Sequence, residues 1–148
     1  MKLVVIESPL CGRPPERCPT FLRPLVERVL RERNRHFAFA CMRFELAKGN
    51  APYASHVTFD QPGLLEDSKP EQRALGIAVG QAWSAVGNSR SFFETRGMSG
   101  GMLLGEANAK AAGQARHYWF HVDGYRPLAL WRCALAAVLR WMLAGVYR

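Results

Sequence analysis

The strongest constraint on the fold is a short apolar run, LVVI at residues 3–6, which ends in Ser8-Pro9. A short, continuous run rich in β-branched residues is typical of a strand buried on both faces, as in a parallel sheet. Helix-like and strand-like patterns then alternate along the chain, with helices expected at 20–48, 70–86 and 101–112 and strands at 91–94 and 115–122. This alternation predicts an α/β fold with a parallel sheet.

Residues that favour helix ends support these boundaries. Gly49 suits the end of the first long helix, and Pro70 suits the first turn of the second. Ser99 can cap the third helix, and Gly113 can stop it. We therefore expect a small doubly wound parallel sheet, Rossmann- or flavodoxin-like and flanked by helices, with residues 51–69 as a long loop between two helices.

The C-terminal segment, residues 128–148, is apolar and long enough for a membrane span to be considered. Arg132 and Arg140 argue against a span, because each costs about 2.5–3.5 kcal/mol near the centre of a bilayer. The segment fits an amphipathic helix with Arg132, Arg140 and Arg148 opposite an apolar side made of Trp131, Leu135, Val138, Leu139, Met142 and Val146. We expect this helix to pack on the domain or on a partner subunit, with contact to a membrane surface as the alternative.

The length of 148 residues fits one α/β domain at 1–126 followed by the helical extension at 127–148. The net charge is +8, and the basic excess lies in residues 1–35 and 126–148, while residues 36–125 are neutral. A basic total fits nucleic acid, phosphate or acidic lipid as a partner. A solvated helix face that carries arginines gives the same total and is the commoner cause.

The four cysteines, Cys11, Cys18, Cys41 and Cys133, lack the short Cys-x2-Cys spacing of a zinc site. The apolar start of the chain is too short for a secretory signal, so we expect reduced thiols in a cytoplasm. We expect neither a metal nor a cofactor.

The turn SGGM, made of Ser99, Gly100, Gly101 and Met102, comes directly before the third expected helix. Free N–H groups at a helix start, with glycines that allow close approach, suit a phosphate or carboxylate. The alternative is an ordinary helix cap by Ser99. Glu106 follows on the same helix and is a candidate nucleophile or general acid/base, or else a solvent-facing glutamate.

A second group of polar residues lies between the first two helices, in the expected loop. His56, Asp60 and Gln61 occur there within a segment of about 18 residues, a length that is usually functional or disordered. A histidine beside a carboxylate suits acid/base chemistry or a polar pocket, although a structural hydrogen bond is the commoner role. We expect these side chains to face a pocket beside Ser8-Pro9.

Taken together, the segments resemble a known group of proteins. The sequences that carry the resemblance are NRHFAFACMRFELAKGNAPYASHVTFDQPGLLED, PEQRALGIAVGQAW and SGGMLLGEANAKAAG. They are similar to an uncharacterised family of small phage and bacterial proteins within the nucleoside 2-deoxyribosyltransferase-like superfamily. The resemblance covers roughly residues 2–118 and does not include the tail after Pro127.

This resemblance implies a doubly wound parallel sheet and chemistry at the N-glycosidic bond of a nucleoside or nucleotide. In relatives that act on nucleoside monophosphates, a Ser-x-Gly turn holds the phosphate and a glutamate attacks C1′ of the sugar; Ser99 to Gly101 match that turn. The superfamily glutamate falls at the position of Gly105, and Glu106 is one place later, turned by about 100° on a helix. The catalytic acid would then be Glu106 or Asp60, or the chain would bind without cleaving.

The resemblance also implies a homo-oligomer in which a neighbour closes the site. The expected ligand contacts come from Ser8, Pro9, Asn34, His56, Gln61, Ser99, Gly100, Gly101 and Met102. The first hypothesis is thus a nucleotide N-glycosidase or deoxyribosyltransferase, and the second is a module that senses or sequesters a nucleotide derivative. A basic protein that binds nucleic acid or a membrane surface is a third hypothesis, which the neutral middle of the chain disfavours, and no stable nucleic-acid partner is expected.

Overall fold

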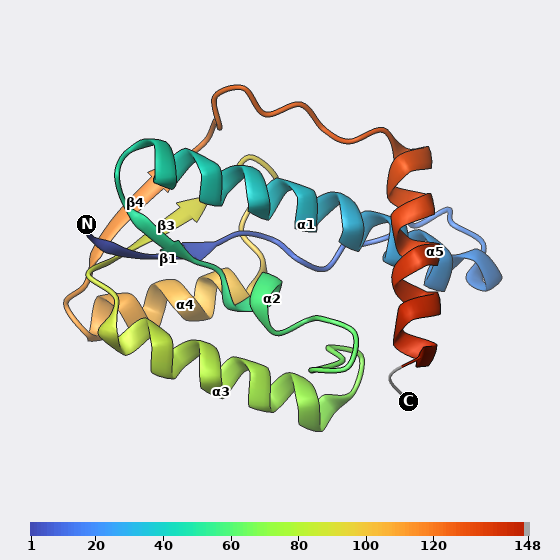
Figure 1. Ribbon diagram of the computed structural model, residues 1–148, viewed down its shortest axis with the longest axis horizontal. Coiled ribbons are helices and arrows are strands. Elements are labelled where there is room, and N and C mark those ends of the chain that lie inside the picture. The colour runs from blue at the N-terminus through green and yellow to red at the C-terminus, as the bar shows by residue number, and fades with distance from the viewer. Residues whose placement is uncertain (147–148) are drawn as a thin grey trace.

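The structure, a computed structural model, describes residues 1–146 and has a parallel sheet at its centre (Figure 1). The strands are β1 (Leu3–Glu7), β2 (Ala51–Tyr53), β3 (Ser89–Phe93) and β4 (Ala115–Trp119). They form one four-stranded sheet in the order β2-β1-β3-β4, and every neighbouring pair is parallel. The expected α/β fold with a parallel sheet is therefore confirmed.

Helices cover both faces of the sheet. The longer helices are α1 (Arg23–Ala47), α3 (Pro70–Val86), α4 (Gly100–Ala111) and α5 (Leu130–Val146), with short turns at η1 (Thr20–Leu22) and α2 (Ser55–Thr58). In Figure 1, α1 lies on one side of the sheet, α3 and α4 lie on the other, and α5 crosses the N-terminal half of α1. This arrangement is the doubly wound layering expected from the sequence.

The core lies between α1 and one face of the sheet. Val4 and Ile6 of β1 and Phe93 of β3 pack there against Phe37 and Cys41 of α1, and all five are buried. Alternate residues of a strand face opposite sides, so the intervening residues of β1 and β3 face α3 and α4. The end of β1 therefore presents its last side chain toward α4.

The strand order creates a crevice at one edge of the sheet. After β1 the chain adds β2 on one side of it and then β3 on the other, so the order reverses between β1 and β3. Glu7 at the end of β1 pairs in register with Phe92 of β3. Ligands of open α/β sheets bind at such a reversal, outside the carboxyl ends of the strands.

Several predicted helix ends are confirmed. Gly49 and Gly113 follow the ends of α1 and α4 with φ of 77° and 64°, a conformation that glycine adopts without strain. Pro70 is the first residue of α3. The helix expected at 20–48 is instead a 3-10 turn followed by α1, because Pro24 lies at the start of the α-helix.

The prediction of one long loop at 51–69 is confirmed only for residues 59–69, which form no helix or strand. The first residues of the segment form β2, which pairs with β1 along Leu3 to Val5, and α2 follows after Ala54. The strand is only three residues long and contains Pro52, which is tolerated because β2 is an edge strand. The expected strand boundaries also shift, because β3 begins earlier, at Ser89, and β4 ends earlier, at Trp119.

The C-terminal helix α5 forms as expected, but it packs against α1 through the side opposite to the predicted apolar one. Cys133 and Ala137 are buried, and Arg140 beside them donates from Nε to Glu32 Oε1 of α1 at 2.7 Å and from Nη1 to Gln61 Oε1 at 2.8 Å. The predicted apolar side faces solvent instead, with exposed side chains at Trp131, Leu135, Val138, Leu139, Met142 and Val146. Two features explain this docking side. Cys133 and Ala137 are small and allow α5 to approach α1 closely, and the buried carboxylate of Glu32 requires a cation as its partner.

Within residues 1–146, no helix combines the length and the apolar character that crossing a membrane requires. Coverage of the apolar side of α5 by a partner subunit or a membrane surface stays a prediction. Arg148, expected on the polar side of this helix, lies outside the described residues.

We predict that Arg140→Ala lowers the free energy of unfolding by about 1–3 kcal/mol, because buried Glu32 loses its shortest charged hydrogen bond. Arg132→Ala is the matched control on the same helix, exposed and stacked on Trp131; its effect is expected within about 0.5 kcal/mol. Urea unfolding measures both. Equal effects of the two substitutions would contradict the assigned docking side.

Candidate functional site

A cavity of about 820 Å³ opens at the carboxyl ends of β1 and β3, at the reversal of strand order. Its walls come from residues 7–13 after β1, from α2 and α3, and from residues 96–105. Ligand pockets for small molecules are usually about 300–1,000 Å³, so a ligand of nucleotide size fits.

One wall of the cavity is the start of α4. Ser99 is the N-cap, and its Oγ accepts from the backbone N–H of Met102 at 3.3 Å. The N–H groups of Gly100 and Gly101, the first two residues of the helix, have no acceptor within the helix and line the cavity. The cap predicted for Ser99 is confirmed. The free amides, at the positive end of the helix dipole, make this part of the wall electropositive.

Arginines dominate the charges of the cavity wall. Four of them line it, against two carboxylates, and the residues are Arg13, Arg73, Arg90, Arg96, Glu7 and Asp67. Arg13 is exposed and makes no ion pair with a described residue, whereas Arg73 is bound to Asp67 at 2.8 Å. The cavity therefore favours an anion, and Arg13 is a cation available to it.

His56 of α2 faces the cavity beside the end of β1. Its Nε2 and Ser8 Oγ are 2.9 Å apart, which joins the two residues in a hydrogen bond. Desolvation lowers the pKa of His56 to about 4, helped by the positive charge of Arg35 and opposed by Asp60. The imidazole is therefore neutral at pH 7 and serves as a hydrogen-bonding group rather than as a cation.

Asn34 of α1 joins two loops that line the cavity. Its Nδ2 donates to Leu10 O at 3.1 Å, and its Oδ1 accepts from Arg96 Nη1. Arg96 also donates to Tyr125 Oη at 3.1 Å, so its guanidinium is held in place. Asn34 lines the cavity, as predicted, and it fixes the segment after β1 against the segment after β3.

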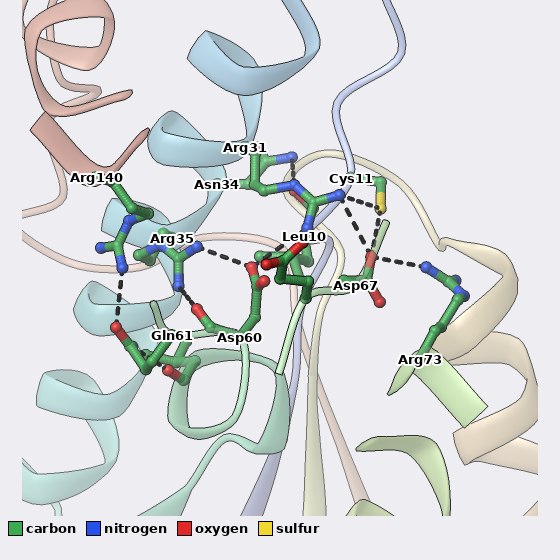
Figure 2. Close-up of polar contacts among 12 residues, drawn as sticks. Leu10, Cys11, Arg31, Asn34, Arg35, Asp60, Gln61, Asp67, Arg73 and Arg140 are labelled. Atoms are coloured by element: carbon green, nitrogen blue, oxygen red, sulfur yellow. Dashed lines mark hydrogen bonds and ion pairs between the residues drawn. The ribbon is translucent and has the colours of Figure 1, made fainter. Parts of the chain in front are cut away.

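Asp60 and Gln61 do not line the large cavity. Their side chains meet arginines of α1 and α5 instead (Figure 2). Asp60 Oδ2 accepts from Arg35 at 2.8 Å and from Arg31 at 3.2 Å. Gln61 accepts from Arg140 of α5. Asp60 lines only a pocket of about 100 Å³ that adjoins the large cavity and shares His56 and Asp67 with it. Because Asp60 is bound by two arginines, it acts as an anchor for its loop.

The same arginine cluster continues toward the cavity. Figure 2 shows Arg31 and Arg73 converging on Asp67, whose Oδ2 accepts from Arg31 at 3.3 Å and from Arg73 at 2.8 Å. Cys11, after β1, donates from Sγ to the same oxygen at 3.6 Å. These contacts hold residues 60–67 against α1 and α3 and shape the side wall of the cavity.

Glu106 lies on α4 but not in the cavity wall. Tyr118 of β4 donates its hydroxyl to Glu106 Oε1, and this bond raises the pKa of Tyr118. The one-residue offset from Gly105 turns the Glu106 side chain toward β4, away from the carboxyl ends of β1 and β3.

Glu7 is a cavity residue that the sequence analysis missed. It is the last residue of β1, its side chain is only 17% exposed, and its Oε1 accepts from Arg90 Nη1 at 3.1 Å. Burial raises the pKa of Glu7 to about 7, against the lowering effect of Arg90. A polar residue directly after a buried apolar strand was the available signal, because strand ends carry the ligand contacts of this fold.

Eight of the eleven predicted site residues line the large cavity. They are Ser8, Pro9, Asn34, His56, Ser99, Gly100, Gly101 and Met102. Asp60, Gln61 and Glu106 do not. Within residues 1–146, no group of three or more His, Cys, Asp or Glu side chains is arranged to hold a metal ion.

Fold and site together define a small α/β protein with an arginine-lined cavity at the reversal of strand order. The chain matches a family model described as Domain of unknown function (DUF7768) over residues 2–119. Because this span covers most of the chain, the protein belongs to the DUF7768 family. The match contains the whole sheet and ends before α5.

No curated protein and no solved structure matches the chain significantly. The family description assigns no activity, so the expected kinship with nucleoside 2-deoxyribosyltransferases stays a prediction.

Titration of His56 gives a test of the site's electrostatics. Because the folded-state pKa lies below the ordinary 6.5, the neutral ring stabilises the fold above pH 6.5, and this contribution is lost as pH falls toward 4. We predict that His56→Gln gains stability relative to the parent protein over that fall, by at most about 3 kcal/mol.

Glu7→Gln should show the opposite trend. The folded-state pKa of Glu7 is raised, so its contribution is present below pH 4.5 and is lost as pH rises through about 7. The variant therefore gains relative stability as pH rises. Urea unfolding at a series of pH values measures both differences; a difference that does not change with pH would contradict the burial assigned to that group.

Proposed function

We propose that this protein binds a nucleoside 5′-monophosphate or a close derivative in the cavity and acts on its N-glycosidic bond, as a hydrolase or a deoxyribosyl transferase. The observation that carries the proposal is the pairing of free amides at the start of α4 with an arginine-rich wall in a cavity of about 820 Å³. The phosphate would lie at Ser99, Gly100 and Gly101, because helix-start amides and cations both stabilise an anion there.

The remaining contacts supply a place for the sugar and base. Ser8 and neutral His56 offer hydrogen-bonding groups at the end of β1. Met102, Leu104 and Ile77 contribute apolar surface to the same cavity. Polar groups at both ends of the cavity, with apolar side chains between them, suit a ligand that has a charged phosphate, a hydroxylated sugar and a flat base.

A module that binds a nucleotide without cleaving it is the second candidate. The specific observation in its favour is the position of Glu106, the expected attacking carboxylate, which is bonded to Tyr118 outside the cavity. Release of free base distinguishes the candidates, since only the enzyme produces it.

We predict that nucleoside 5′-monophosphates bind more tightly than the corresponding nucleosides and that Arg13→Ala weakens binding of the monophosphates about 10-fold or more, the loss of one charged hydrogen bond. Isothermal titration calorimetry measures both affinities. Binding of the nucleosides should not change, because Arg13 is assigned to the phosphate.

Arg17→Ala is the matched control for this test. Arg17 lies in the same segment, is exposed, and does not line the cavity. A monophosphate affinity that responds equally to both substitutions, or that is no higher than the nucleoside affinity, would contradict the phosphate position.

A further inference from the structure

Glu7 lies where the fold brings reacting groups and ligands together. It ends β1 at the reversal of strand order and lines the cavity, on the side of the sheet that faces α4. It is also buried more deeply than a solvent-facing glutamate would be. Its carboxyl group is thus largely shielded from solvent.

The chain makes room for this carboxyl group at one position of α4. A Cβ at Gly105 would lie 2.6 Å from Glu7 Oε1 and 2.8 Å from its carboxyl carbon. Any side chain at position 105 would therefore displace the Glu7 carboxyl group. Glycine at this position permits the helix and the carboxyl group to occupy adjacent space.

The orientation of Glu7 is fixed from the opposite side. Arg90 of β3 donates from Nη1 to Glu7, and its Nε donates to Gln114 Oε1 at 3.0 Å. Gln114 in turn donates to Ser84 O at 2.6 Å and to Gly87 O at 3.0 Å. A guanidinium held by both ends keeps the carboxyl group in one position.

Both protonation states of Glu7 are accessible at neutral pH. Desolvation raises its pKa to about 7, and Arg90 is the charged group that opposes this rise. The neighbouring wall of α4 contributes Gly105, which is uncharged, and His56 of α2 is neutral at this pH. A carboxyl group with a pKa near the working pH is suited to donate a proton and to take one back.

The other acidic residues near the site are bound by arginine or tyrosine side chains. Asp67, the second acidic residue of the cavity wall, accepts from Arg31 and Arg73. Asp60 is bound to Arg35 and Arg31 outside the cavity, and Glu106 is bound to Tyr118. Among the acids of the described cavity wall, Asp67 is thus bound by two arginines, whereas Glu7 is bound by one, through Oε1.

We propose that Glu7 is the proton-transfer residue of this cavity, acting first as the acid and then as the base in cleavage of the N-glycosidic bond. As the bond between C1′ and the base nitrogen breaks, its electron pair leaves with the nitrogen, which takes the proton of Glu7. The carboxylate left behind stabilises the positive charge on the sugar. Water then bonds to C1′ and returns a proton to Glu7, which gives free base, the sugar phosphate and the original carboxylic acid.

This inference rests on the proposed function, and its test separates the two. The test measures base release by chromatography and binding by calorimetry, with the eight common ribo- and deoxyribonucleoside 5′-monophosphates as probes. With the monophosphate that reacts, Glu7→Gln is expected to lower the rate of base release about 100-fold or more while its affinity stays within a few-fold. The rate of the parent protein should fall as pH rises past about 7, because the acid must be protonated.

Gly105→Ala tests the same group without changing it. The added methyl group displaces the Glu7 carboxyl group, so base release should slow in Gly105→Ala. In a Glu7→Gln background the same substitution should cause no further slowing, because the displaced group no longer acts. Glu106→Gln should release base at the parent rate, since its carboxylate is outside the cavity.

Three results would overturn the inference about Glu7. They are base release by Glu7→Gln at the parent rate, loss of base release in Glu106→Gln, and binding of monophosphates by the parent protein without any base release. The third result leaves nucleotide binding standing. Absence of both binding and release would overturn the proposed function as well.

Discussion

The position of β1 between β2 and β3, with all strands parallel, is the constraint on which the site depends. This order brings the segments that follow β1 and β3 to one edge of the sheet and leaves a crevice between them. Asn34 then joins those two segments, because it donates to Leu10 O and accepts from Arg96. The cavity is thus a consequence of strand order, and side chains set its charge.

Charge in the cavity is organised in two layers. The inner layer is Glu7 with Arg90, in which burial and the cation act in opposite directions on one carboxyl group. The outer layer consists of Arg13 and the amides of Gly100 and Gly101. We propose that a phosphate binds to the outer layer and that proton transfer takes place at the inner one. A separate group of arginines anchors residues 60–67 and α5 (Figure 2). It consists of Arg31, Arg35, Arg73 and Arg140.

Much of the architecture could be predicted from local sequence patterns. The apolar run of β1, Pro70 at the start of α3 and Ser99 at the start of α4 each act through neighbouring residues, so their signals are local. The short strand β2 was missed because its three residues, one of them a proline, show no strand pattern in the sequence. The strand forms only through its pairing with β1. The docking side of α5 depends on Glu32, which is far away in the sequence.

The site was predictable to a similar extent and for the same reason. The Ser99 turn and the Ser8-Pro9 end of β1 could be found because each is a local motif at a predictable place in the fold. The close approach of Glu7 to Gly105 could not be found from the sequence, because it depends on how α4 crosses the end of β1. The most direct test of the account is a crystal structure with a nucleoside 5′-monophosphate bound. We predict its phosphate at the amides of Gly100 and Gly101 and its C1′–N bond beside Glu7; a nucleotide bound elsewhere, or with its sugar turned away from Glu7, would contradict it.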